Sequence, residues 1–252
     1  MRPGRLFQCA RFRAAATEKF INPKVPPLRE APVTLTVIQA RMGSTRLPGK
    51  ALAQIEGRTA LALTIDAVKR SRLPCWIVVA TTQEREDDEI AYEASRQDVE
   101  VFRGSVEPLT RFAEVAEHYR ASGSEPIVRV TADCPLLDPR YLNPVCDLVR
   151  RGHDYAGVLG APRGRHAEAF TGEVLGAAHR WASAAFDREH VVPWMIKHGR
   201  CGWYRVTDKR EPVELNTAAD LERIRAIAAS PDKWGVAGDF SRFVIADRIE
   251  DE

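Results

Sequence analysis

The chain has 252 residues, 44% of them hydrophobic and 29% charged, and its formal net charge is +2 at pH 7. This length allows one large α/β domain or two small ones with a buried core. The nearly balanced charge gives no signature of nucleic-acid or membrane binding, and no apolar run is long enough to span a bilayer. Five scattered cysteines without a C-x-x-C pair argue against a disulfide framework or zinc knuckle and favour the reducing cytoplasm.

Residues 1–32 differ in composition from the rest of the chain. They hold seven Lys or Arg against two Glu, a net charge of +5 that leaves −3 for the other residues, and several prolines close the segment. Without an apolar stretch it does not fit a secretory signal peptide, although an arginine-rich organellar transit segment stays open. We expect a disordered N-terminal extension, followed by a single domain over residues 33–252.

Apolar periodicity predicts strands and helices in alternation along the body of the chain. Such alternation with short connections predicts a three-layer α/β fold with a mainly parallel sheet, in which ligands bind at the carboxyl ends of the strands. Residues 161–210 are less regular. Strands are expected at 33–39, 75–81, 99–102, 127–131, 154–159 and 202–206, and helices at 59–70, 87–96, 106–120, 139–151, 172–183, 188–198 and 217–229.

The segment that follows the first strand, residues 41–50, is here called the basic loop. It carries Arg41, Arg46 and Lys50, two glycines and two hydroxyl side chains, and no acidic residue. Glycines allow close backbone approach, while guanidinium and ammonium groups neutralise phosphate. A basic surface turn is the alternative, but three cations without a carboxylate favour a polyanionic ligand.

Other polar residues allow two interpretations each. Asp133, just after the strand at 127–131, suits Mg²⁺ or an Asx-turn equally. The run 188–190 (Arg-Glu-His) could position a substrate or form a solvated helix face. His166 and Glu168, in a polar loop, could meet a substrate or be an exposed pair. Asp87 and its neighbour look first like helix N-terminal charges. The residues alone therefore indicate a nucleotide- or phosphate-binding protein with a divalent cation.

Six segments, in order, resemble the cytidylyltransferase family: IQARMGSTRLPGKAL, VVATTxxxxDDEI, VFRGS, IVRVTADCPLLDP, REHVVPWM and LNTAADLERI. The nearest group is the spore-coat polysaccharide biosynthesis (SpsF-like) cytidylyltransferases, and more distant ones are the CMP-KDO and CMP-acylneuraminate synthetases. The resemblance covers residues 33–230. It implies a Rossmann-like nucleotidyltransferase (GT-A-like) fold.

The resemblance also implies a reaction. An acceptor oxygen attacks the α-phosphate of CTP and pyrophosphate leaves, which activates a sugar, sugar acid or other small acidic acceptor for polysaccharide or glycoconjugate biosynthesis. Mg²⁺ or Mn²⁺ is the implied cofactor. CTP and a small-molecule acceptor are the implied partners, whereas no nucleic-acid or membrane partner is expected. A homodimer stays open.

Site residues follow from the resemblance position by position. Catalytic roles fall on Arg41, Arg46, Lys50 and Asp133. Nucleotide binding falls on Ala40, Arg41, Gly43, Ser44, Arg46, Lys50, Ala80, Thr81, Thr82, Arg103, Gly104 and Asp133, with Ser105 and Arg111 nearby. Acceptor binding falls on Arg129, His166, Glu168, Arg188, Glu189 and His190. Metal binding falls on Asp133 and Asn216.

Two positions depart from the family pattern. Asn216 stands where the family usually has the second metal-binding Asp, and an amide brings no charge, so metal affinity should fall. The loop Gly-Leu-Asp-x-Glu reads here Gly164-Arg165-His166-Ala167-Glu168. Arg165 and His166 should make the acceptor pocket more positive, which predicts an acceptor with a phosphate, phosphonate or carboxylate group.

Two alternative functions stay open. Asn216 is the feature that suggests a nucleotide-binding partner protein that has lost turnover. A GT-A-type glycosyltransferase acting on a preformed nucleotide sugar is the second alternative. The intact basic loop speaks against it, because a triphosphate needs those cations more than a diphosphate sugar does.

Overall fold

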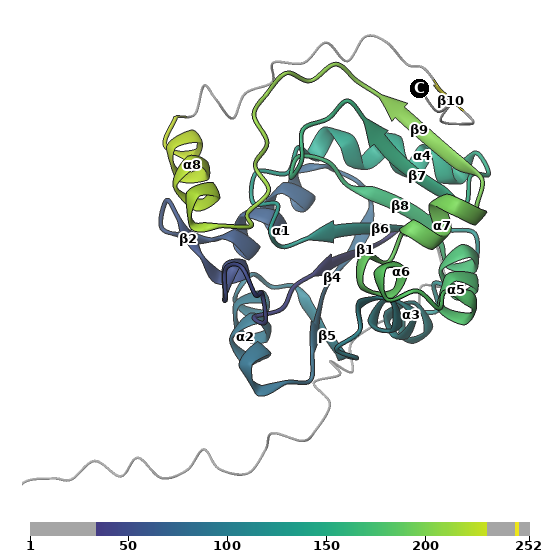
Figure 1. The fold of residues 1–252 in the computed structure, drawn as a ribbon, viewed down its shortest axis with the longest axis horizontal. Coiled ribbons are helices and arrows are strands. Elements are labelled where there is room, and N and C mark those ends of the chain that lie inside the picture. The colour runs from purple at the N-terminus through teal and green to yellow at the C-terminus, as the bar shows by residue number, and fades with distance from the viewer. Residues whose placement is uncertain (1–33, 231–244, 247–252) are drawn as a thin grey trace, which may run out of the picture.

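The structure is a computed structural model that describes residues 34–230 and 245–246, so the expected N-terminal extension lies outside the described residues. A twisted sheet with the strand order β10-β9-β7-β8-β6-β1-β4-β5 runs through the molecule (Figure 1). Its strands are β1 (Thr34–Gln39), β4 (Cys75–Thr82), β5 (Glu100–Gly104), β6 (Pro126–Thr131), β7 (Tyr155–Leu159), β8 (Glu168–Thr171), β9 (Cys201–Arg205) and β10 (Ile245–Ala246). Two short strands, β2 (Gln54–Ile55) and β3 (Arg58–Thr59), form a separate hairpin.

Helices cover both faces of the sheet and confirm the predicted three-layer α/β fold. They are α1 (Ala60–Arg70), α2 (Asp88–Arg96), α3 (Pro108–His118), α4 (Leu142–Arg150), α5 (Gly172–Trp181), α6 (Ala185–His190), α7 (Pro193–His198) and α8 (Ala218–Ala228), with single 3₁₀ turns η1 (Lys50–Leu52), η2 (Arg85–Asp87) and η3 (Pro139–Tyr141). No helix among the described residues is long and apolar enough to cross a membrane.

The two faces of the sheet are packed by different helices. Apolar side chains of α1, α2 and α4, such as Ile65, Ile90 and Val145, form one cluster with alternate strand residues. Those of α3 and α5, such as Phe112 and Leu175, form a second cluster on the other face, where α3, α5, α6 and α7 gather (Figure 1). Because both faces are covered, the strands read as continuous apolar runs.

The sheet is mainly parallel, as predicted, but one inner strand was missed. Strands β1, β4, β5 and β6 pair in parallel, whereas β8 is antiparallel to both β6 and β7. The prediction that Glu168 lies in a polar loop is therefore wrong, because Glu168 is the first residue of β8. Four residues are too few to show a period of two, and only the long-range pairing with β6 and β7 makes this segment a strand.

The predicted helix at 188–198 is two helices. Val191 ends α6 with φ of +71°, and Val192 donates its N–H to the carbonyl of His190 at 2.8 Å. Pro193 then begins α7. Proline lacks the N–H that a continuous helix would need there but suits the first turn of a new one.

Gly164 lies in the β7–β8 loop (residues 160–167), where this loop closely approaches the backbone of the segment that follows β9. Its φ is +81°, and an added Cβ would overlap the backbone of Val213 and Glu214. Gly164→Ala is expected to lower the free energy of unfolding by about 3 kcal/mol. The control Gly57→Ala has a similar φ of +73° but open space around it, so about 1 kcal/mol is expected. Urea denaturation measures both, and equal losses would contradict the close approach.

Candidate active site

The basic loop leaves the end of β1 and folds back on itself. Ser44 and Gly49 both donate their N–H groups to the carbonyl of Met42, at 2.8 and 3.0 Å, and Gly49 has a φ of +70°. A left-handed conformation of this kind suits glycine. The turn presents Arg41, Arg46 and Lys50 on one short segment.

Asp87, a buried residue, fastens the basic loop to the end of β4. Its carboxylate accepts hydrogen bonds from Met42 N at 2.7 Å, from Thr82 N at 3.0 Å and from the Thr82 hydroxyl. Burial raises the pKa of Asp87, but these hydrogen bonds from Thr82 and Met42 outweigh it and hold the pKa below its usual value. The sequence suggested only a helix-terminal charge here, because the partners are remote in the chain.

Lys50 joins the basic loop to two other segments. Its ammonium donates to Asp133 Oδ2 and, at 3.2 Å, to Asn216 Oδ1, and Arg46 donates to the same amide oxygen at 3.0 Å. Thr131 fixes the other oxygen of Asp133 with a hydrogen bond of 2.5 Å. The structure thus brings together four of the residues singled out from the sequence, from three distant parts of the chain.

The same contacts shift the charge state of Asp133. Burial raises the pKa of its carboxyl, but the charge and hydrogen bond of Lys50, together with the hydrogen bond from Thr131, bring the pKa below its usual value. Asp133 therefore carries a negative charge at neutral pH.

Asp133 and Asn216 form a small set of oxygen donors. Because both contact the same ammonium nitrogen, they lie near enough to share one cation. No group of three His, Cys, Asp or Glu able to hold a metal occurs among residues 34–230 and 245–246. One carboxylate and one amide oxygen fit Mg²⁺ or Mn²⁺, which take their remaining oxygen ligands from phosphates and water.

The end of β4 and the end of β5 lie beside the basic loop in the sheet order. Ala40, Ala80, Thr81 and Thr82 are buried, so mainly their backbone edges are available to a ligand. Arg103 donates to the carbonyls of Thr82 and Glu84 at 2.9 and 2.7 Å.

Gly104, at the end of β5, has no room for a side chain, because an added Cβ would overlap the carboxylate of Glu114. Next to it, Ser105 donates its N–H to that carboxylate at 2.8 Å and accepts a hydrogen bond from buried Arg111 at its carbonyl. Burial and the nearby charge of Arg41 lower the pKa of Arg111 to about 10.

The residues 188–190 at the end of α6 separate in space. Glu189 accepts a hydrogen bond from Arg41 at 2.8 Å and so reaches the basic loop. Arg188 instead binds Glu107 with two hydrogen bonds of 2.5 and 2.6 Å, and this contact lowers the pKa of Glu107 to about 2. His190 is exposed, with its ring 4.4 Å from that of Phe186.

A second polar group lies on the sheet itself. Arg129 on β6 donates to Glu168 on β8 at 2.6 Å, and Tyr155 on β7 donates to the other oxygen of Glu168 at 2.9 Å. Arg129 Nε and His166 Nδ1 are buried and have no hydrogen-bond partner among the described residues. Glu168 is therefore part of a partly buried chain of hydrogen bonds rather than an exposed loop residue.

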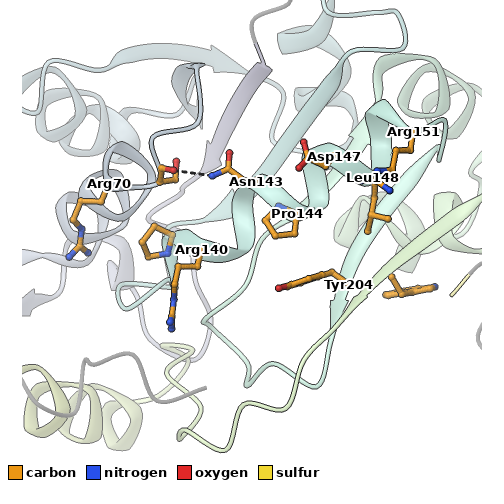
Figure 2. A pocket seen from close by; sticks show the side chains of 11 residues that line it. Arg70, Arg140, Asn143, Pro144, Asp147, Leu148, Arg151 and Tyr204 are labelled. Carbon is orange, nitrogen blue, oxygen red and sulfur yellow. Dashed lines mark hydrogen bonds between the residues drawn. The ribbon is translucent and has the colours of Figure 1, made fainter. Parts of the chain in front are cut away.

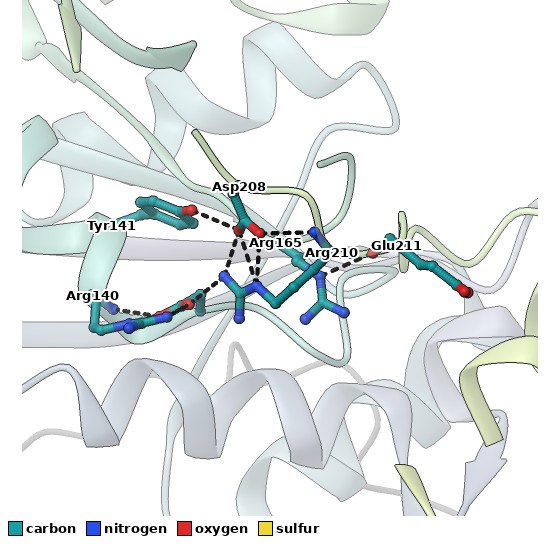
Figure 3. Close-up of polar contacts among 7 residues, drawn as sticks. Arg140, Tyr141, Arg165, Asp208, Arg210 and Glu211 are labelled. Atoms are coloured by element: carbon teal, nitrogen blue, oxygen red, sulfur yellow. Dashed lines mark hydrogen bonds and ion pairs between the residues drawn. The ribbon is translucent and has the colours of Figure 1, made fainter. Parts of the chain in front are cut away.

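Arg165 does not lie where the sequence led us to expect. Only 2% of the residue is exposed, and its Nε donates to the carbonyl of Glu211 at 2.9 Å (Figure 3). Burial lowers the pKa of Arg165, and the positive charge of neighbouring Arg210 lowers it further. The expectation that Arg165 adds positive charge to an open acceptor pocket is therefore not met, because the side chain is held between two segments of the protein.

A cavity of about 480 Å³ lies elsewhere, on the outer side of α4 (Figure 2). Arg70 and Arg140 lie at one end of it and Arg151 at the other, with Tyr204 between them. None of the residues singled out from the sequence lines this cavity. The candidate site is instead the polar edge where β1, β4 and β6 end.

A mainly parallel sheet covered on both faces, with cations and a carboxylate at its carboxyl edge, is typical of α/β proteins that bind a phosphorylated ligand at that edge. A family model described as "Cytidylyltransferase" matches residues 35–214, and the chain belongs to that family. It is accordingly a CTP-dependent nucleotidyltransferase, as the motifs predicted.

Two curated relatives are similar over much of the chain. The spore coat polysaccharide biosynthesis protein SpsF of Bacillus subtilis is 33% identical over 77% of this chain and 85% of its own length. The 3-deoxy-manno-octulosonate cytidylyltransferase of Aeromonas salmonicida is 31% identical over 64% of this chain, and the match spans 63% of that enzyme.

Solved structures share the fold. A cytidylyltransferase from Leptospira borgpetersenii superposes with a TM-score of 0.72 at 28% identity, covering 82% of this chain and 90% of its own. CMP:2-keto-3-deoxy-manno-octonic acid synthetase, solved with CTP, gives a TM-score of 0.64 at 16% identity, covering 78% of this chain and 98% of its own, and supports the fold alone.

Asp87→Asn tests the anchor of the basic loop. The folded pKa of Asp87 is lowered, so its charge stabilises the fold above the unfolded pKa of about 3.9, and this contribution is lost as the pH falls through the folded pKa. An amide offers one oxygen to three donors, and we expect a loss of about 2 kcal/mol at pH 7 that shrinks below pH ~4. Urea denaturation at pH 7 and at pH ~2.5, below the unfolded pKa, measures it, with exposed Asp147→Asn as control; a gap independent of pH would contradict the role of the charge.

Proposed function

We propose that this protein transfers CMP from CTP to the oxygen of a small acidic acceptor, a sugar acid in the first instance, and releases pyrophosphate. The observation that carries the proposal is the convergence of Arg46, Lys50, Asp133 and Asn216 at the carboxyl edge of the sheet. That edge is where a parallel α/β sheet binds its ligand, and the family membership of the chain supports CTP as that ligand.

The basic loop is proposed to hold the triphosphate. Arg41, Arg46 and Lys50 would neutralise the charge on the transferring and leaving phosphates, with Gly43 and Ser44 allowing close approach and donating a hydrogen bond. Because Lys50 already contacts Asp133, the phosphate would share this ammonium with the carboxylate. The cytosine would lie against the ends of β4 and β5, near Thr82 and Gly104.

Asp133 and Asn216 are proposed to hold the divalent cation, Mg²⁺ or Mn²⁺. When bound, the ion would add positive charge next to the phosphates. Asp133 contributes its charge, which the lowered pKa keeps at neutral pH. Asn216 contributes only an amide dipole and therefore a weaker hold on the metal.

The acceptor is proposed to lie on the sheet side of the basic loop. Arg129 and Glu168 are already paired there, and Arg129 Nε and His166 Nδ1 are two buried nitrogens without a partner among the described residues. Glu189 reaches the basic loop through its contact with Arg41, and Glu189 and His190 are proposed to border the acceptor from that side. With Arg165 buried, a negatively charged acceptor would rely on Arg129 and His166. Arg188, which binds Glu107, would contribute indirectly by fixing α6.

A second candidate is a nucleotide-binding protein without turnover, which Asn216 favours because the amide serves as acceptor for Arg46 and Lys50. A glycosyltransferase on the same fold is less favoured, since three cations suit a triphosphate better than a diphosphate sugar. We propose the cytoplasm as the compartment, in keeping with the scattered cysteines, and keep a homodimer as an expectation.

Arg46→Ala and Asp133→Ala test the transfer. Each should lower kcat/KM for CTP-dependent pyrophosphate release by about 100-fold or more, because charge stabilisation in the transition state is lost. Exposed Arg200→Ala and Asp147→Ala are the matched controls and should keep full activity. The measurement is a matrix of the four nucleotides against acidic and neutral acceptors. If no pair of nucleotide and acceptor releases pyrophosphate, the transfer is contradicted. If only neutral acceptors support release, the acidic acceptor is contradicted.

Asn216→Asp tests the proposed metal site separately from the reaction. A second carboxylate should raise Mn²⁺ affinity in the presence of CTP by about tenfold, measured by calorimetry. Thr217→Ser, next in the chain, is the control. Unchanged affinity would show that residue 216 does not touch the metal and would favour its role as acceptor for the two cations.

A further inference from the structure

A buried ion cluster lies behind the candidate site. Arg210 donates through Nε to Asp208 at 2.9 Å and through Nη2 to Asp208 at 2.5 Å and Asp138 at 2.6 Å (Figure 3). The exposed fractions of the three side chains are 9% for Arg210, 5% for Asp138 and 1% for Asp208. Arg140 pairs with Asp138 from the other side, and Tyr141 donates to Asp208 at 2.8 Å.

The cluster connects two segments that carry site residues. Asp138 ends the Asp133 loop (residues 132–138), and Arg210 lies in the connecting segment (residues 206–217) that runs from β9 to Asn216. Backbone hydrogen bonds link the same segments: Leu215 donates its N–H to the carbonyl of Asp133 at 2.8 Å. Asp138 also donates its N–H to the carbonyl of Arg165 at 2.8 Å, which connects the β7–β8 loop to the same two segments.

The connecting segment has little regular structure of its own. No helix or strand lies between β9 and α8, and the segment is attached only at points: a bridge at Thr207 and backbone hydrogen bonds from Val206, Asp208 and Val213 to residues 159–163. Its side-chain contacts include the buried Val213 and Leu215, the hydrogen bond from Arg165 to the carbonyl of Glu211, and the Arg210 cluster. Apolar contacts tolerate small shifts, whereas a planar guanidinium bound to two carboxylates fixes direction and distance.

The guanidinium is suited to this role. Burial lowers the pKa of Arg210, but its hydrogen bonds and charge pairing with Asp208 and Asp138 raise it above the ordinary value, so Arg210 keeps its charge. The same hydrogen bonds, opposing the effect of burial, lower the pKa of Asp208 to about 2. Burial likewise raises the pKa of Asp138, but its hydrogen bonds from Arg140 and Arg210 outweigh burial and lower the pKa, so all three groups are ionised at neutral pH. Among the described residues, none of the three forms a hydrogen bond with Lys50, Asp133 or Asn216.

We propose that Arg210 is a positioning residue for the transfer reaction. By binding Asp138 and Asp208 at once, it fixes the connecting segment against the Asp133 loop. It thereby sets the place of the Asn216 amide relative to Asp133 and Lys50. The expected effect of Arg210 on turnover rests on the proposed function. Its effect on the connecting segment and the Asp133 loop rests on the geometry alone.

Arg210→Lys tests it, because lysine keeps the charge but cannot bridge two carboxylates with a planar fork. We expect kcat to fall by about tenfold while the Kd for CTP changes by less than about threefold. Arg150→Lys, at the opposite end of β1 where Arg150 donates to Thr34 at 2.8 Å, is the matched control and should change neither.

A double-mutant cycle with Asn216→Ala separates positioning from general loss of structure. If Arg210 acts through Asn216, the effect of Arg210→Lys on kcat should fall to less than about twofold once Asn216 is alanine. Full additivity of the two effects, or an unchanged kcat in Arg210→Lys, would overturn the proposal.

Hydrogen exchange supplies a readout that needs no activity. The Leu215 amide, bound to the carbonyl of Asp133, should exchange about tenfold faster in Arg210→Lys than in the unaltered protein and in Arg150→Lys. Absence of pyrophosphate release from the unaltered protein would defeat the proposed function, and the exchange of Leu215 would then decide alone. Equal exchange rates would overturn the positioning role.

Discussion

The contact of one ammonium group with two oxygen atoms joins three segments of the chain at the carboxyl edge of the sheet. Lys50 leaves the basic loop, and its Nζ meets Asp133 after β6 and Asn216 before α8. These three residues lie more than 80 positions apart along the chain. Because a hydrogen bond weakens steeply when its distance or angle departs from the preferred range, small shifts of any of the three segments would weaken this contact. The surrounding structure limits such shifts.

Two buried carboxylate systems limit them from opposite sides. Asp87 binds the backbone of the basic loop and of β4, and Arg210 binds Asp138 and Asp208 behind the Asp133 loop. Asp87 accepts hydrogen bonds from backbone N–H groups, and Arg210 donates to carboxylates; regular sheet or helix hydrogen bonds do not provide these partners. Leaving one such group unpaired costs more than the pair itself contributes, so these clusters specify one arrangement of the loops.

Much of this could be predicted from the sequence, and the failures share one cause. The strands, the basic loop after β1 and Asp133 after β6 are local patterns, since a strand followed by a glycine-rich cationic turn shows in consecutive residues. Strand β8, the anchor role of Asp87 and the burial of Arg165 depend on partners far away in the chain: β6 and β7, Met42, and Glu211. A single sequence contains no trace of such pairings, so Glu168 read as a loop residue and Arg165 as a free cation.

The neutral amide of Asn216 affects the positive charge that the basic loop can offer to a phosphate. Arg46 and Lys50 both donate to Asn216 Oδ1, which orients them without neutralising them. A carboxylate in that place would bind the metal more strongly but would cancel one of the loop's positive charges. In the proposed site, the amide would leave a greater net positive charge beside Asp133 before a polyanionic nucleotide binds, and would so increase the attraction for the triphosphate. The proposed assignment thus exchanges metal affinity for phosphate affinity, and the metal would be held chiefly by Asp133 together with the phosphates it neutralises.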